Sequence, residues 1–87
     1  MKFRKKPVEV EAIQFKNTRE GRQKLFDFVI GPHITWHMHM NKMSVETING
    51  WVTLFPGEWL VRGVIGEYYP CADEIFKETY ELIDTQS

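Results

Sequence analysis

The sequence predicts a single α+β domain over residues 1–87: a mostly antiparallel sheet arranged as a β-meander, with one helix in the N-terminal half and one short helix near the C-terminus. Three observations support this fold class. Residues 33–40 alternate between polar and apolar side chains with the period of two that is typical of strands. Asn49-Gly50 separates two apolar runs, which is a strong signal for a hairpin. The apolar residues of 19–30 recur at helical spacing and predict an amphipathic helix.

The first thirty residues predict a strand followed by this helix. Residues 8–15 are rich in β-branched side chains and partly alternate, so they favour a strand. Asn17-Thr18 offers side-chain oxygens that can cap a helix N-terminus, and Gly31-Pro32 is typical of a helix end. We therefore expect the helix to run from about residue 19 to about residue 30.

The alternation over residues 33–40 predicts a strand whose two faces differ. One face would be apolar and the other rich in histidine. The apolar face consists of Ile34, Trp36, Met38 and Met40, and the polar face consists of His33, Thr35, His37 and His39.

The rest of the chain predicts a continuing meander. In the hairpin, strands over residues 43–48 and 51–55 flank Asn49-Gly50, and we expect a positive φ at both turn residues. Both helices would pack against one face of the sheet. The remaining predicted elements are a turn at Pro56-Gly57, a strand over 59–64, a turn at Ile65-Gly66, a strand over 67–69, a short helix capped by Asp73 and a final strand over 81–83.

Composition excludes several classes of protein. With 43% hydrophobic and 14% aromatic residues the chain can build a core, so intrinsic disorder is not expected. A net charge of -1 argues against a general nucleic-acid binder. The single cysteine cannot form an internal disulfide, and no apolar run approaches the roughly 20 residues of a membrane span. We therefore expect a soluble, cytoplasmic protein that does not associate with membranes and has no cofactor.

Residues 56–71 and 75–81, together with the start of the chain, resemble a widespread family of small, uncharacterised phage and prophage proteins. That family has Pro-Gly-Asp-(Trp or Tyr) at a turn and Gly-Glu-(Phe or Tyr)-Tyr-Pro-Cys before the last helix. Here Pro56-Gly57-Glu58-Trp59 and Gly66-Glu67-Tyr68-Tyr69-Pro70-Cys71 match this signature, with Glu58 where the family commonly has Asp. Residues 4–15 resemble the usual start of the family, whereas residues 16–44 have no counterpart. The resemblance implies a phage or prophage origin and action on a system of the bacterial host.

The histidines raise the question of a metal site. His37 and His39 are two residues apart on one predicted strand face, and Cys71 or a carboxylate could add a ligand. No Cys-x-x-Cys or His-Glu-x-x-His motif accompanies them, so a solvated polar face is the simpler interpretation. Contact with an anionic ligand or another subunit is a further alternative. For Cys71 we expect a buried structural thiol.

The leading hypothesis is a non-catalytic binding protein that forms homo-oligomers. It would serve in anti-defence, either by sequestering a nucleotide signal or by inhibiting a host protein. A structural or assembly protein of the phage particle and a metal- or thiol-dependent enzyme are the alternatives, although no catalytic motif is present. The expected ligand-binding residues are Arg4, Lys5, Lys6, Trp59, Arg62, Tyr68 and Tyr69.

Overall fold

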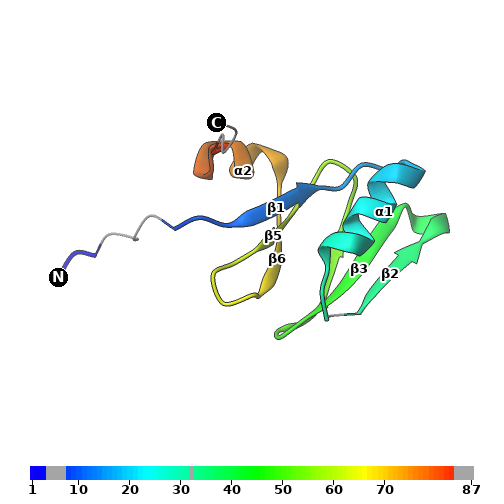
Figure 1. Cartoon of the computed structure of the whole chain (residues 1–87), viewed down its shortest axis with the longest axis horizontal. Coiled ribbons are helices and arrows are strands. Elements are labelled where there is room, and N and C mark those ends of the chain that lie inside the picture. The colour runs from blue at the N-terminus through cyan, green and yellow to red at the C-terminus, as the bar shows by residue number, and fades with distance from the viewer. Residues whose placement is uncertain (4–7, 32, 84–87) are drawn as a thin grey trace.

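A computed structural model describes residues 1–3, 8–31 and 33–83 of the chain. Its described part contains two α-helices and two three-stranded antiparallel sheets, which confirms the predicted α+β class (Figure 1). The elements are β1 (Glu11–Gln14), α1 (Arg19–Phe28), β2 (Ile34–His37), the 3₁₀ turn η1 (Met38–Met40), β3 (Lys42–Thr47), β4 (Gly50–Leu54), β5 (Trp59–Arg62), β6 (Tyr68–Cys71) and α2 (Asp73–Thr79).

Each sheet has a central strand with an antiparallel neighbour on both sides. In the first, called sheet A, the order is β1-β5-β6, and Leu60 of β5 pairs with Ile13 and Pro70. In the second, sheet B, the order is β2-β3-β4, and Val45 of β3 pairs with Ile34 and Val52. Strands β4 and β6 approach each other, so the two sheets adjoin along these strands.

The main core lies between the two sheets and α1. Every second residue of β3 and β5 points into it, as strand geometry requires. Helix α1 adds the buried residue Leu25, and Val29, directly after the helix, is buried beside it. This cluster supplies most of the apolar burial of the domain. Its buried members are Phe15, Leu25, Val29, Met43, Val45, Leu54, Leu60 and Tyr68.

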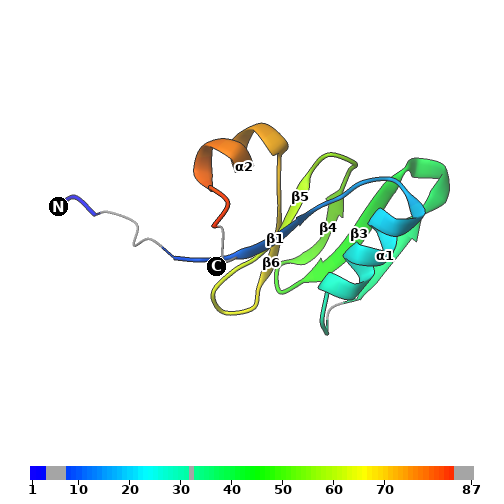
Figure 2. The ribbon, with the colours of Figure 1, turned by 45° about the horizontal axis from the view of Figure 1, so that its top comes forward.

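The second helix covers the opposite face of sheet A. Trp59 points away from the main core and stacks on Phe76 of α2, with ring centroids 4.0 Å apart and planes 7° apart. Val61 shares this face and is fully buried. The expectation that both helices pack on one face is therefore wrong, because β5 is apolar on both faces and needs cover on each side (Figure 2).

Helix α1 begins as the sequence predicts and ends earlier. The Thr18 Oγ1 accepts a hydrogen bond from the Gly21 amide at 2.9 Å, which satisfies a free donor of the first turn. The helix ends at Phe28, two residues before the predicted end, because Val29 is extended at φ -82° and ψ 115°. Similarly, β1 covers only four of the eight residues expected for the first strand.

The β3–β4 hairpin forms, but its turn lies one residue earlier than predicted. The loop residues are Ile48 and Asn49, and Gly50 pairs with Thr47. Gly50 has a φ of 101°, whereas Asn49 is not among the residues with positive φ, so the expected positive φ at both positions is wrong. The Thr47 hydroxyl donates to the Gly50 carbonyl at 2.7 Å and accepts from the Asn49 amide at 3.2 Å, which fixes this geometry.

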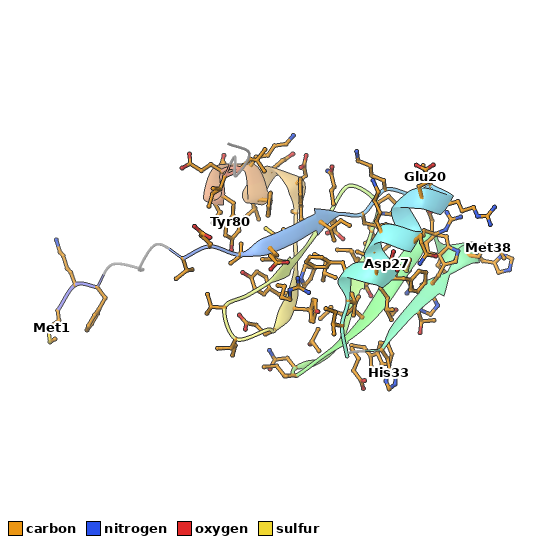
Figure 3. All side chains as sticks on the ribbon, in the orientation of Figure 1. Met1, Glu20, Asp27, His33, Met38 and Tyr80 are labelled. Carbon is orange, nitrogen blue, oxygen red and sulfur yellow. The ribbon has the colours of Figure 1, made fainter. Side chains whose placement is uncertain are left out.

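The predicted eight-residue strand over 33–40 is wrong in its second half. Strand β2 ends at His37, which pairs with Lys42 of β3, so the four residues between them must reverse the chain. Met38–Met40 form the 3₁₀ turn η1 and Asn41 adopts the left-handed conformation at φ 52°. Met38 is 70% exposed rather than part of an apolar face, and it lies at the opposite end of β2 from His33 (Figure 3).

The C-terminal part also differs from the prediction in detail. Asp73 is the first residue of α2 rather than its cap, and Ala72 occupies the cap position without a side-chain hydrogen bond. Residues 81–83 form no strand. The turn predicted at Pro56-Gly57 is present: Glu58 N–H donates to the Phe55 carbonyl at 3.0 Å, and Gly57 has a φ of 94°.

The burial of Leu60 predicts its contribution to stability. Leu60→Ala should lower the free energy of unfolding by about 2–5 kcal/mol, because it leaves a cavity in the main core. Leu82→Ala is the matched control: Leu82 is 96% exposed, so its truncation should change stability by less than about 0.5 kcal/mol. Urea denaturation followed by circular dichroism measures both, and equal losses would contradict the described core.

Candidate functional site

The residues expected to bind a ligand do not gather on one face. Three of them, Arg4, Lys5 and Lys6, lie outside the described residues. The other four lie on the adjacent strands β5 and β6, where alternation divides them between the two faces of sheet A. Trp59 and Tyr69 are on the face toward α2, and Arg62 and Tyr68 are on the face toward α1.

Arg62 makes contacts that join β5 to β1, β6 and α1. Its guanidinium forms an ion pair with Glu11, donates to the Phe28 carbonyl at 3.0 Å and lies 4.6 Å from the centroid of the Phe28 ring. It also donates to the Tyr68 hydroxyl at 3.3 Å. The hydrogen bond to Tyr68, followed by the one to Glu11, raises the pKa of Arg62. The hydroxyl of Tyr68 further accepts from the Ile30 amide at 2.9 Å, so both side chains are engaged in the fold.

Trp59 is engaged on the other face. Its Nε1–H donates to the Asp73 carboxylate at 2.9 Å while its ring stacks on Phe76. Asp73 also forms an ion pair with Lys77, one helical turn later, at 3.0 Å. The hydrogen bond from Trp59 and then the one from Lys77 lower the pKa of Asp73. The contact thus joins β5 to the start of α2, and the flat face of the indole is covered by the Phe76 ring.

Tyr69 completes the packing of α2 against sheet A. Its hydroxyl lies 2.9 Å from the hydroxyl of Tyr80, which follows the helix. Burial and then the hydrogen bond with Tyr80 raise the pKa of Tyr69 above the ordinary value of a phenol. Figure 3 shows Tyr80 on the side of α2 that faces the sheet. Each of the four residues on β5 and β6 therefore has an internal partner.

The histidines and the cysteine are likewise separate from one another. The His33 Nδ1 lies 2.9 Å from a Glu46 carboxylate oxygen, and the His37 Nε2 lies 2.8 Å from the Ser44 hydroxyl. His39 lies in η1. Cys71 on β6 is half-buried, so the expectation of a buried thiol is wrong. Within residues 1–3, 8–31 and 33–83, no group of three or more His, Cys, Asp or Glu side chains is placed to bind one metal ion.

A different surface stands out at one end of the domain. The tips of the β3–β4 hairpin and of the β5–β6 loop point in the same direction, and the end of α1 lies next to them (Figure 1 and Figure 2). All three segments expose branched aliphatic side chains. We call this surface the loop end; it consists of Ile30, Ile48, Val64 and Ile65, which are 72%, 81%, 67% and 81% exposed.

A shallow groove of about 250 Å³ lies between the two tips. Ile48 forms one side, and Gly66 and Glu67 form the other. Glu46 also lines the groove, so the charged residues beside it are acidic. Of the four loop-end residues, Ile48 lines this groove, and it does so together with the two carboxylates.

The loop-end side chains are placed by tight turns. The Gly66 N–H donates to the Gly63 carbonyl at 3.0 Å, and the Gly63 N–H donates to the backbone carbonyl of Glu67 at 2.7 Å. These two bonds put Val64 and Ile65 at the tip of the loop. The Glu67 carboxylate accepts from the Ile65 amide at 3.1 Å. The sequence signal for this surface is an apolar residue at a turn position, as in Ile48-Asn49 and Val64-Ile65, where polar residues are usual.

Comparisons with known proteins give no further guide to this surface. No protein-family model matches the chain, and searches of curated proteins and of solved structures give no significant match. Neither helix of the described part is long and apolar enough to cross a membrane.

The contacts of Asp73 predict a pH-dependent contribution to stability. Because its pKa in the folded protein lies below the value of about 3.9 for an unfolded aspartate, its carboxylate stabilises the fold above that pH. This contribution is lost as the pH falls through the lower, folded value. Asp73→Asn should therefore be less stable than the unchanged chain at pH 7, and the difference should shrink in acid.

Urea midpoints measured from neutral pH into the acid range test this. Asp27→Asn is the control, since Asp27 accepts only from the side chain of Gln23, at 2.9 Å, among the described contacts. A stability gap for Asp73→Asn that stays constant as the pH falls would contradict the prediction.

Proposed function

We propose that this chain is a phage- or prophage-encoded, non-catalytic binding protein that acts in the cytoplasm of the bacterial host by contacting a host protein through the loop end. The observation that carries this proposal is the exposure of four branched aliphatic side chains on three neighbouring segments. Surface apolar residues are common singly, and several of them exposed on neighbouring segments favour an interaction site. The origin rests on the resemblance of the segments around Pro56-Gly57 and Gly66–Cys71 to phage proteins.

The turns favour binding because they order the apolar tips beforehand. A flexible loop loses conformational freedom when it binds, whereas Ile48 and Ile65 belong to turns already fixed by hydrogen bonds. Burial of each exposed side chain against a partner would contribute about 25 cal/mol for every Å² of apolar surface removed from water. The loop end can thus supply the central contacts of a small interface.

The border of the loop end indicates the chemistry of its partner. Glu46 and Glu67 line the groove beside Ile48, so a partner with an apolar pocket bordered by lysine or arginine would complement it. A nucleotide is less well supported, because the rings of Trp59 and Tyr69 and the guanidinium of Arg62 already have partners in the fold. Inhibition of a host defence protein is therefore the form of anti-defence that we propose.

The proposal predicts an activity that depends on the loop end. Ile48→Asp combined with Ile65→Asp should abolish activity without loss of folding, because both side chains are exposed and the new charges would have to be buried at the interface. Ile75→Asp combined with Leu82→Asp is the matched control, with the same charge change at residues of α2 and the following segment that are 59% and 96% exposed.

The measurement is phage plating on bacterial strains that each carry one defence system and express one of the three proteins. The unchanged chain and the control should restore plating on at least one strain, and the loop-end variant should not. No restoration on any strain would reject the anti-defence role. If the loop-end variant restored plating as well as the unchanged chain, the proposed contact would be rejected. Heat released when the chain is titrated with linear or cyclic nucleotides would also reject it. Detection of the chain in purified virions would favour an assembly role.

A further inference from the structure

The outer face of sheet B, which points away from the main core, is a regular grid of side chains. Alternation along the strands places residues 42, 44 and 46 of β3 on this face, with residues of β2 and β4 beside them. Thr35, Trp51 and Thr53 of this face are exposed. By the pairing register its three rows are His33, Glu46 and Trp51; Thr35, Ser44 and Thr53; and His37 and Lys42, with Phe55 continuing the third row just after β4.

The central row of the outer face permits close approach of another flat surface. Thr35, Ser44 and Thr53 have short hydroxyl side chains that can both donate and accept hydrogen bonds. Two antiparallel sheets pack face to face at a separation of about 10 Å when the side chains between them fit. Trp51 and Phe55, which are 55% and 50% exposed, flank the central row along β4 and supply the large apolar side chains of the face.

The charged residues of the face are complementary to those of a second copy in one orientation. Lys42 and Glu46 lie on the central strand at equal distances on either side of Ser44. A two-fold axis that crosses the strands at Ser44 lays each strand over its own copy, running in the opposite direction. Lys42 of each copy then faces Glu46 of the other, which gives two such pairs in one dimer.

The same operation matches the outer strands. On β4, Trp51 faces Phe55 of the other copy, so an aromatic pair forms on each side of the axis. A two-fold axis parallel to the strands would instead place Lys42 over Lys42 and Glu46 over Glu46, which like-charge repulsion disfavours. The positions of Lys42 and Glu46 thus select one of the two face-to-face arrangements.

We infer that the outer face of sheet B is a homodimer interface in which two copies pack face to face with Lys42 of each opposite Glu46 of the other. A second copy of the chain is the inferred partner because the charges of the face are complementary to those of the same face on another copy. Three strands about 4.8 Å apart make a face smaller than the roughly 800 Å² per partner of a stable interface, so the dimer is weak and forms as concentration rises. The inference does not rest on the proposed function, whose apolar contacts come from the loop end.

Charge reversal tests the interface and its orientation together. Lys42→Glu places like charges opposite Glu46 in both halves of the dimer, and Glu46→Lys does the same opposite Lys42, so each variant should dimerise at least about tenfold more weakly than the unchanged chain. A mixture of the two variants should form a heterodimer at least as tight as the original dimer, because every facing pair then has opposite charges. Sedimentation equilibrium over a range of concentrations measures all of these species.

Two further variants separate the face from other contacts. Thr53→Arg should abolish dimerisation, because two arginines would meet across the interface, whereas Ile65→Asp at the loop end should leave it unchanged. Circular dichroism verifies that each variant folds. A monomeric unchanged chain at millimolar concentration would overturn the inference, as would a mixture of the two charge variants that stays monomeric or a dimer that survives Thr53→Arg.

Discussion

Strand β5 is buried on both faces, and the positions of the other elements follow from this burial. Leu60 points into the main core beneath α1, and Val61 points toward α2; both are fully buried. Leaving either face in water would cost about 25 cal/mol for every Å² of apolar surface. Summed over several side chains, this free energy is large compared with the stability of so small a domain. The chain therefore places α1 and sheet B on one side of β5 and α2 on the other.

This arrangement decides which aromatic side chains belong to the interior. Trp59, Tyr68 and Tyr69 lie on β5 and β6, so they pack against one helix or the other and find hydrogen-bond partners there. Trp51 lies on β4 with its side chain on the uncovered face of sheet B, and it is more than half exposed. Residue type alone does not determine which of these aromatic rings is buried. Their burial depends on the strand and on the face of the sheet where each ring lies.

The sequence allowed the elements with strong local signals to be predicted. Thr18 caps α1 and Gly57 supplies the positive φ of its turn, because both depend on the chemistry of a few neighbouring residues. The end of β2 could not be predicted, since the alternation continues through Met38 and Met40 while the chain reverses at Asn41 to pair His37 with Lys42. That reversal is set by the pairing of strands and not by the pattern of side chains.

The candidate surfaces likewise include features that local sequence predicts and features that depend on how the strands pair. The face of each side chain on β5 follows from alternation, but the sequence does not indicate that both faces are covered, so Arg62 was expected at a ligand site and instead joins Glu11, Phe28 and Tyr68. The loop end could have been anticipated from Ile65 at a turn position. The outer face of sheet B required the register, which alone shows that Lys42 and Glu46 flank Ser44 at equal distances.

The two surfaces proposed for interaction share one residue. Glu46 lines the groove at the loop end and also lies on the outer face of sheet B, beside His33. A dimer that pairs Glu46 with Lys42 of the other copy would therefore occupy one of the carboxylates at the border of the loop end. Its negative charge would then be neutralised, and Glu67 would supply most of the acidic character that a basic partner meets. Dimerisation would thus weaken the electrostatic attraction of such a partner and leave the apolar contacts of Ile48 and Ile65 unchanged, which couples the two surfaces through charge.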